Sequence, residues 1–268
     1  MPKNNQHFIS VIIPVYKQAQ TIRQDIYSIY DTLERIRYNY EIIVVVDGTK
    51  IDNSYNEIKK LKLKNLKLFG YENNHGKGYA VRYAMARAKG DYIAFIDAGM
   101  EIDPNGLSLI IEQLEWYEAD IIVGSKRHPA SIVNYPFQRK IISFGAQIIS
   151  RILLNINVRD TQAGLKIFKR QVLEKVLPRL LIKNYAFDLE LLSVSNRLGF
   201  SRIYEAPIKL VYDFKGLTHA TGIKTIYNCF IGALSVFYRL RLLKYYDDKN
   251  KRKWIYDSEL DMRINTGL

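Results

Sequence analysis

The feature that most constrains the fold is a regular alternation of short apolar runs with segments of helical periodicity. Four short runs read as strands, and the first two are buried runs rich in β-branched residues: FISVIIPVY (8–16), EIIVVVDG (41–48), LKLFGY (66–71) and DYIAFID (91–97). The segment 18–37 between the first two runs places isoleucine and leucine at helical spacing. This alternation predicts an α/β fold with a mostly parallel sheet and right-handed crossovers. In such sheets, functional residues gather at the carboxyl ends of the strands.

The second half of the chain continues the alternation. Pro104 and Asp103 indicate a helix start, because proline suits the first turn and aspartate caps free amides. The other expected elements are helices at 54–61, 78–89, 139–154, 171–177, 187–198 and 224–243, and strands at 119–127 and 203–214. No repeat or flexible linker is evident. We therefore expect one compact domain, residues 1–222, with a helical C-terminal extension, residues 223–268.

The charge of the chain is strongly positive. Forty lysines and arginines against 27 aspartates and glutamates give a net charge of +13, which favours nucleotides, phosphates or anionic lipid as partners. Nucleic acid is disfavoured, because no module of interleaved aromatic and basic residues occurs. The single cysteine, Cys229, excludes a disulfide framework and a cysteine zinc site. With no apolar run of about 18 residues and no signal-peptide pattern, we expect a cytoplasmic chain without a transmembrane helix.

A series of motifs points to a known family. In chain order they are SVIIPVY, EIIVVVDGT, NHGKGYAVRYAMARAKGDYIAFIDAG, ADIIVGSKR, FQRKIIS, DTQAGLKIFKR, FDLELL and YEAPI. Their order and spacing resemble the family 2 glycosyltransferases with the GT-A fold. Within these, the chain looks most like the polyprenol-phosphate sugar transferases typified by dolichyl-phosphate mannose synthase. The resemblance covers about residues 8–243, and it implies a Rossmann-like GT-A catalytic domain at 1–222.

The resemblance implies a set of nucleotide-binding residues. A carboxylate at Asp47 can accept hydrogen bonds from a base or a ribose, and Lys77, in a glycine-rich loop, can pair with phosphate. The chain departs from the family at Lys17–Gln18, where Asn–Glu is usual, and at Val46, where relatives often carry an acid. The implied nucleotide-binding residues are Pro14, Tyr16, Asp47, Asn74, Lys77 and Asp97.

The segment IDAGMEID stands where the family has an Asp–x–Asp motif that binds a divalent metal. The metal bridges the donor's diphosphate and stabilises the charge that develops on it. The chain keeps Asp97 but has Gly99 in place of the second acid. Our hypothesis is that Asp97 and Glu101 share a Mg²⁺ or Mn²⁺ ion, with water filling the gap. The rival is a metal-independent site in which basic side chains carry the diphosphate.

The resemblance also implies residues for the acceptor and the sugar. Lys126, Arg127, Arg139 and Ser143 would hold a lipid phosphate, which is already a nucleophile and needs no general base. Asp188 would bind sugar hydroxyls, or act as a base if the acceptor were a hydroxyl. Lys215 stands near the place of a family arginine that the chain lacks. The residues expected to shape the sugar and acceptor pocket are Asp160, Gln162, Lys166 and Lys215.

The C-terminal helix, residues 223–243, is too polar to span a bilayer, and it is followed by a cluster of basic residues. It is either a buried core helix or an interfacial helix that lies on the membrane. We expect peripheral attachment to the membrane surface, with a membrane partner protein as a further candidate. No motif is evident in 254–268.

Together these features predict an inverting glycosyltransferase. It would move a hexose from a GDP- or UDP-hexose to a polyprenyl phosphate at the cytosolic face of the membrane. One alternative is transfer to a glycan or protein hydroxyl, with Asp188 as the base. Another is a non-catalytic nucleotide-sugar-binding scaffold, which the glycine at position 99 suggests.

Overall fold

The structure is a computed structural model of the chain. It describes residues 4–133, 154, 156, 158–184, 186–211, 223–250 and 253–265, with side chains left out at 4–6 and 223–229.

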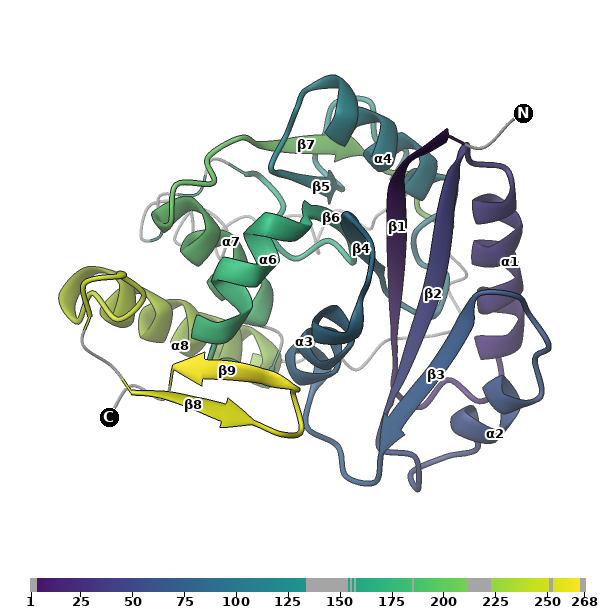
Figure 1. Cartoon of the computed structure of the whole chain (residues 1–268), viewed down its shortest axis with the longest axis horizontal. Coiled ribbons are helices and arrows are strands. Elements are labelled where there is room, and N and C mark those ends of the chain that lie inside the picture. Colours follow the sequence, from purple (N-terminus) through teal and green to yellow (C-terminus); the bar gives the residue numbers. More distant parts are fainter. Residues whose placement is uncertain are drawn as a thin grey trace.

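A seven-stranded sheet forms the centre of the molecule (Figure 1). Its order is β3-β2-β1-β4-β6-β5-β7. The pairs β1–β2, β1–β4, β2–β3 and β5–β7 are parallel, whereas β6 runs antiparallel to both β4 and β5. This confirms the expected mostly parallel α/β sheet. The strands are β1 (Asn4–Val15), β2 (Tyr38–Asp47), β3 (Leu66–Tyr71), β4 (Tyr92–Ile96), β5 (Ile121–Ser125), β6 (Leu165–Lys169) and β7 (Ile203–Pro207).

Helices cover both faces of the sheet, because alternate strand residues point to opposite sides. On β1, Val11 and Ile13 join a core with α1 and α4, and Ile12 joins a second core with α3, α6, α7 and α8. Burial on both faces explains why these strands read as unbroken apolar runs. The helices are α1 (Ile22–Glu34), α2 (Ser54–Lys59), α3 (Lys77–Arg87), α4 (Gly106–Trp116), α6 (Arg170–Val176), α7 (Phe187–Arg197) and α8 (Ile223–Phe237).

Most expected elements differ by a few residues from their observed bounds, and two of these differences correct a specific prediction. Helix α4 begins at Gly106, after Asn105, and not at Pro104. The Asp103 carboxylate instead accepts the Asn105 N–H at 3.0 Å, so Asp103 forms a turn before the helix and does not cap it. The strand expected at 203–214 ends at Pro207. The helix expected at 139–154 lies almost entirely outside the described residues.

The C-terminal part packs onto the rest of the molecule. Val236, Leu240 and Tyr245 belong to the same core as α3 and α7. A single π-helical turn, η3 (Tyr238–Leu242), follows α8, and a hairpin of β8 (Trp254–Asp257) and β9 (Met262–Asn265) follows η3 (Figure 1). The sequence did not predict this hairpin. In the described part of the chain, no helix is both long and apolar enough to cross a membrane.

A buried glutamate joins the C-terminal part to helix α7. Glu190 is fully buried, and its carboxylate accepts the N–H groups of Leu181 at 3.0 Å and Ile182 at 2.8 Å. Its other oxygen accepts the hydroxyl of Tyr246 at 2.7 Å and lies 3.5 Å from the Arg239 guanidinium. Burial raises the pKa of Glu190, and these partners act against that rise. The carboxylate therefore fixes a loop next to α7 and the end of the C-terminal helix together.

Two neighbouring tyrosines give a matched test of the contact between Glu190 and the C-terminal part. Tyr246→Phe removes a hydroxyl donor from a buried carboxylate and should lower the free energy of unfolding by about 1.5–3 kcal/mol. Tyr245→Phe removes a donor to the backbone oxygen of Asn265, at 2.6 Å, and should cost about 0.5–1.5 kcal/mol. Urea denaturation measures both values. Equal costs would show that the Glu190 carboxylate does not depend on Tyr246.

Candidate active site

The polar residues of the site lie where parallel strands end. Asp47 ends β2, and Asp97 directly follows β4. Because β1, β2, β3 and β4 are parallel, their carboxyl ends meet at one edge of the sheet. The chain order reverses direction across the sheet at β1 and β4, which is where ligands of open α/β sheets bind.

Asp47 shapes the loop that leads into α3. It is buried, and its carboxylate oxygens accept the N–H groups of His75 at 2.7 Å and Gly76 at 2.9 Å. Gly76 has φ +97°, and a Cβ there would lie 2.6 Å from the carbonyl oxygen of Lys183. Glycine is therefore required at this turn. In this structure the Asp47 carboxylate therefore holds the loop.

Lys77 is the first residue of α3, and its side chain reaches the end of β4. Its Nζ atom lies 2.7 Å from Oδ2 of Asp97 and 3.9 Å from Oδ2 of Asp188. Lys77 thus stands between two carboxylates at a helix N-terminus, a position that also favours phosphate.

The position of Asp97 depends on Gly164, which bonds to its backbone and leaves room for its side chain. Its N–H donates to the carbonyl oxygen of Gly164 at 2.8 Å. A Cβ at Gly164 would lie 2.3 Å from Oδ2 of Asp97, so the glycine makes room for the carboxylate. Oδ1 of Asp97 is buried and has no hydrogen-bond partner in the part of the chain that the structure describes.

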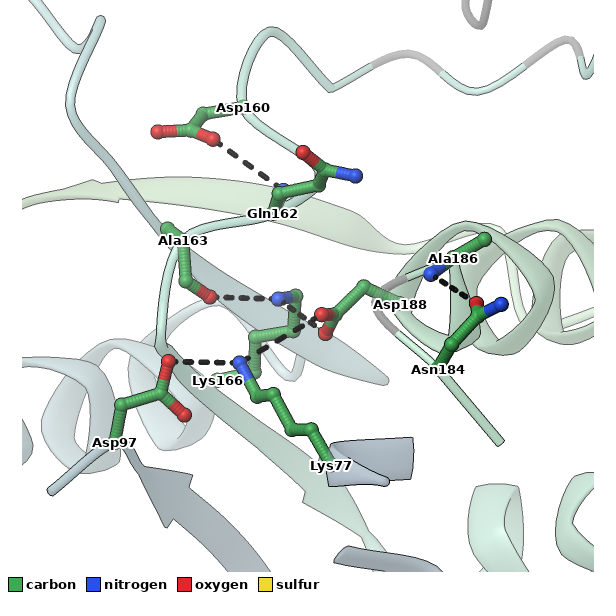
Figure 2. Close-up of polar contacts among 9 residues, drawn as sticks. All are labelled: Lys77, Asp97, Asp160, Gln162, Ala163, Lys166, Asn184, Ala186 and Asp188. Carbon is green, nitrogen blue, oxygen red and sulfur yellow. Dashed lines mark hydrogen bonds and ion pairs between the residues drawn. The ribbon is translucent and has the colours of Figure 1, made fainter. Parts of the chain in front are cut away.

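Lys166 and Asp188 form a buried ion pair beside Lys77 (Figure 2). Lys166, on β6, is fully buried, and its Nζ donates to Oδ1 of Asp188 and to the carbonyl oxygen of Ala163, both at 2.7 Å. Burial lowers the pKa of Lys166, and Asp188 acts against this. Four charges of alternating sign therefore meet from four elements: Asp97, Lys77, Asp188 and Lys166. We call these four residues the charge cluster.

A second group of predicted residues surrounds the loop after β5. Asp160 is buried and accepts the N–H groups of Lys126 at 3.0 Å and Gln162 at 3.3 Å. This turn directly precedes Ala163 and Gly164, which contact the charge cluster. Burial lowers the pKa of Arg127, and the nearby Asp160 acts against this. The structure thus brings the basic loop and the Asp160 turn together.

Of the remaining predicted residues, some form no hydrogen bond or ion pair with the charge cluster, and the others lie outside the described residues. Tyr16, after β1, and Asn74 are exposed, and Pro14 lies within β1. Glu101 is half-buried, and its carbonyl oxygen accepts the Val211 N–H. Arg139, Ser143 and Lys215 lie outside the described residues.

The loop between Asp97 and Glu101 depends on an aspartate that the sequence analysis did not select. Gly99 has φ +97°, a conformation that L-residues rarely adopt, and its N–H donates to Oδ2 of Asp25 at 2.9 Å. Asp25 is buried in α1, and burial raises its pKa. The available signal was a charged residue at helical spacing from Ile22 and Ile29 on the apolar side of the helix. Gly99 therefore has a backbone role.

The donor groups around Asp97 fit a cation that arrives with a ligand. No group of three or more histidine, cysteine or acidic side chains that could hold a metal occurs among the described residues. The buried, unpartnered Oδ1 of Asp97 is nevertheless a free oxygen ligand. Mg²⁺ and Mn²⁺ prefer oxygen ligands, and Mg²⁺ commonly binds through one or two carboxylates, water and substrate phosphates. The site fits this mode.

Comparison with known proteins gives matches along most of the chain. The model of glycosyl transferase family 2 matches residues 10–177. The chain is 28% identical over 208 residues to a dolichyl-phosphate beta-glucosyltransferase of Dictyostelium discoideum, covering 72% of this chain and 63% of that protein. It is 26% identical over 254 residues to a UDP-N-acetylglucosamine–dolichyl-phosphate N-acetylglucosaminyltransferase of Methanococcus voltae. That match covers 88% of this chain and 96% of the Methanococcus protein. The chain thus spans less than two thirds of the Dictyostelium protein.

A solved structure is also similar. Glucosyl-3-phosphoglycerate synthase of Mycobacterium tuberculosis, in complex with Mn²⁺, UDP and glucosyl-3-phosphoglycerate, matches with a TM-score of 0.64. The identity is 18%, and the match covers 97% of this chain and 87% of that one. This likeness confirms the expected GT-A fold.

A double-mutant cycle tests the buried ion pair. Lys166→Met and Asp188→Asn each leave a buried charge without its partner, and each should cost about 3–5 kcal/mol of unfolding free energy. The double variant should cost less than the sum of the two by about 1–3 kcal/mol.

Urea denaturation measures all three variants. Lys169→Met is the control: this half-buried lysine at the end of the same strand donates to the carbonyl oxygen of Glu118, and its loss should cost about 0.5–1.5 kcal/mol. Additive costs for Lys166→Met and Asp188→Asn would contradict the pairing.

Proposed function

The chain belongs to glycosyl transferase family 2, and from this premise we propose that it transfers a sugar from a UDP-sugar to a polyprenyl phosphate. The observation that carries the proposal is the charge cluster. Its partly exposed lysine, Lys77, and the Asp97 oxygen that lacks a hydrogen-bond partner among the described residues suit a diphosphate leaving group with its divalent ion. The buried aspartate of the cluster, Asp188, is already paired with Lys166. The family match confirms the resemblance that the sequence motifs indicate.

The relatives support the donor and acceptor classes. The Dictyostelium relative is named for transfer of glucose to dolichyl phosphate. The Methanococcus relative is named for transfer of N-acetylglucosamine from its UDP derivative to dolichyl phosphate. We therefore propose glucose or N-acetylglucosamine as the sugar, and uracil as the base. The mannose donor of the synthases that the motifs resemble is the less supported choice.

The donor's diphosphate would bind at the N-terminus of α3, next to Lys77 and Asp97. Amide groups at a helix N-terminus attract phosphate, and Lys77 adds a positive charge there. A Mg²⁺ or Mn²⁺ ion held by Asp97 would neutralise the charge that develops on the leaving diphosphate. The similar synthase contains Mn²⁺ and UDP. Glu101 remains a proposed second ligand.

The acceptor phosphate would bind at the loop after β5, where Lys126 and Arg127 follow the strand. Arg139 and Ser143 would complete this site. A phosphate oxygen attacks the anomeric carbon, the bond from that carbon to the diphosphate oxygen breaks, and UDP leaves with the electron pair. The in-line geometry inverts the anomeric centre. Lys126 and Arg127 hold the nucleophile in place.

The position of Asp188 favours a phosphate acceptor over a hydroxyl acceptor. A hydroxyl needs a general base within hydrogen-bonding reach. Asp188 is the candidate from the sequence, but it is 2% exposed and its Oδ1 accepts the Lys166 ammonium. We therefore assign Asp188 a positioning role: it holds Lys77 and Lys166 beside the diphosphate site.

We further propose that α8 and η3 lie on the membrane surface. Val236 and Leu240 of this segment face the core, yet the outward side is also apolar. Residues 223–246 contain no acid, and Arg241 and Lys244 are exposed beside the apolar side chains. A surface that combines apolar and basic groups suits anionic lipid. The exposed apolar residues are Phe230, Ile231, Leu234, Tyr238, Leu242 and Leu243.

Transfer to lipid phosphate tests the main proposal. The purified chain, given Mn²⁺ and polyprenyl phosphate, should convert UDP-glucose or UDP-N-acetylglucosamine to a glycosylated lipid phosphate, as detected by mass spectrometry. Asp97→Asn should lower kcat on the order of a hundredfold, because stabilisation of the leaving charge is lost. Nucleotide binding without turnover would support the scaffold alternative. Transfer to 3-phosphoglycerate in place of the lipid would also contradict the proposal.

Vesicle sedimentation tests the membrane surface. The chain should bind vesicles of phosphatidylcholine and phosphatidylglycerol, and Leu234→Ser with Leu242→Ser should weaken binding by about tenfold or more. Trp116→Ser is the control, since Trp116 is 85% exposed at the end of α4. Equal losses from both changes would argue against a specific docking surface.

A further inference from the structure

We propose that Lys77 is an exchangeable cation. It neutralises Asp97 while no divalent ion is bound, and it moves to the donor's diphosphate when a divalent ion takes over the Asp97 carboxylate. The inference rests on the proposed function, because it takes the ligand to be a nucleotide diphosphate with a divalent ion. It adds that the ion and the nucleotide bind cooperatively, and that this chain's lysine couples them.

Of the two carboxylates near Lys77, Asp97 depends on it more. The Nζ atom is 2.7 Å from Asp97 and 3.9 Å from Asp188. Asp188 already has the buried ammonium of Lys166 at 2.7 Å. Asp97 has Lys77 on Oδ2, while its buried Oδ1 lacks a hydrogen-bond partner within the described residues. Lys77 therefore supplies the main neutralising charge for Asp97.

Lys77 is also placed so that it can change partners. Its side chain is 17% exposed, against 0% for Lys166, so its ammonium lies at the edge of the site. A lysine is a flexible four-carbon chain with a compact charge. The N-terminal position on α3 disfavours a cation unless an anion is near. That same position favours a diphosphate, so Lys77 gains a new partner when the nucleotide binds.

The charge balance predicts cooperativity. The charge cluster contains two carboxylates and two ammonium groups, so it is formally neutral. A divalent cation that enters alone must displace Lys77 from Asp97 and leaves an excess of positive charge. A diphosphate that enters with it compensates this charge and accepts the displaced ammonium. Each ligand should therefore raise the affinity of the other, and part of that coupling should pass through Lys77.

Mn²⁺ binding measured by electron paramagnetic resonance tests the exchange. Without nucleotide, Lys77→Met should bind Mn²⁺ about tenfold more tightly than the unmodified chain, because the competing ammonium is gone. The factor by which UDP raises Mn²⁺ affinity should fall by about tenfold. Lys77→Arg keeps the charge and should stay close to the unmodified chain in both measurements.

Two further variants serve as controls. Lys67→Met makes the same change in another lysine. Lys67 lies near the start of β3, away from the site, and pairs with Glu41. It should leave both Mn²⁺ measurements unchanged. The double variant Lys77→Met with Asp97→Asn should not show the tighter Mn²⁺ binding expected for Lys77→Met alone. This result would show that the tighter binding takes place at Asp97.

Other results would overturn the exchange. If Lys77→Met leaves Mn²⁺ affinity unchanged or lowers it, Lys77 does not compete with the ion. If neither chain binds Mn²⁺ alone or with UDP, no exchange takes place. These titrations contain no sugar donor and no lipid. A failure of the proposed transfer would appear separately, as absence of glycosylated lipid from a chain that still binds Mn²⁺ and UDP as described.

Discussion

The buried ion pair between Lys166 and Asp188 is the interaction on which the site depends. A fully buried ammonium group is unfavourable unless a carboxylate or other acceptors pair with it. The carboxylate of Asp188, at the start of α7, lies 2.7 Å from the buried Lys166 ammonium. This pair fixes the start of α7 against β6. Its carboxylate then faces Lys77 at the start of α3, and Lys77 faces Asp97 at the end of β4. Four elements distant in the sequence are thereby held at the carboxyl edge of the sheet.

The C-terminal part is connected to the same site through hydrogen bonds. Glu190 holds Tyr246 and the backbone of Ile182. The next residue, Lys183, accepts the N–H of Gly78 at 2.9 Å, one residue after Lys77. A continuous series of contacts therefore runs from the proposed membrane surface to the proposed diphosphate site. Docking on lipid and binding of the donor would act on adjoining segments of one packed structure.

Much of the fold followed from sequence patterns, because burial on both faces makes parallel strands read as apolar runs. The strands that contain Ile12, Val44 and Phe95 were predicted for this reason, and the motif order indicated the family. The antiparallel direction of β6 was not predicted, since period and composition carry no strand direction. The β8–β9 hairpin was missed too, because its strands are short and largely exposed.

All four residues of the charge cluster were predicted from the sequence, but their pairing was not, because it depends on contacts between distant elements. Gly99 was interpreted as a missing acid, whereas its positive φ and its bond to Asp25 reveal a backbone role that only three-dimensional structure displays.

The most direct test of the account compares two acceptors that differ in one group. Initial rates would be measured with a polyprenyl phosphate and with the corresponding polyprenol, using the same UDP-sugar. The account predicts transfer to the phosphate with inversion at the anomeric carbon, and no transfer to the alcohol, because Asp188, the base expected from the sequence, is held in the ion pair with Lys166. Efficient transfer to the alcohol would contradict the account and return Asp188 to the role of a general base.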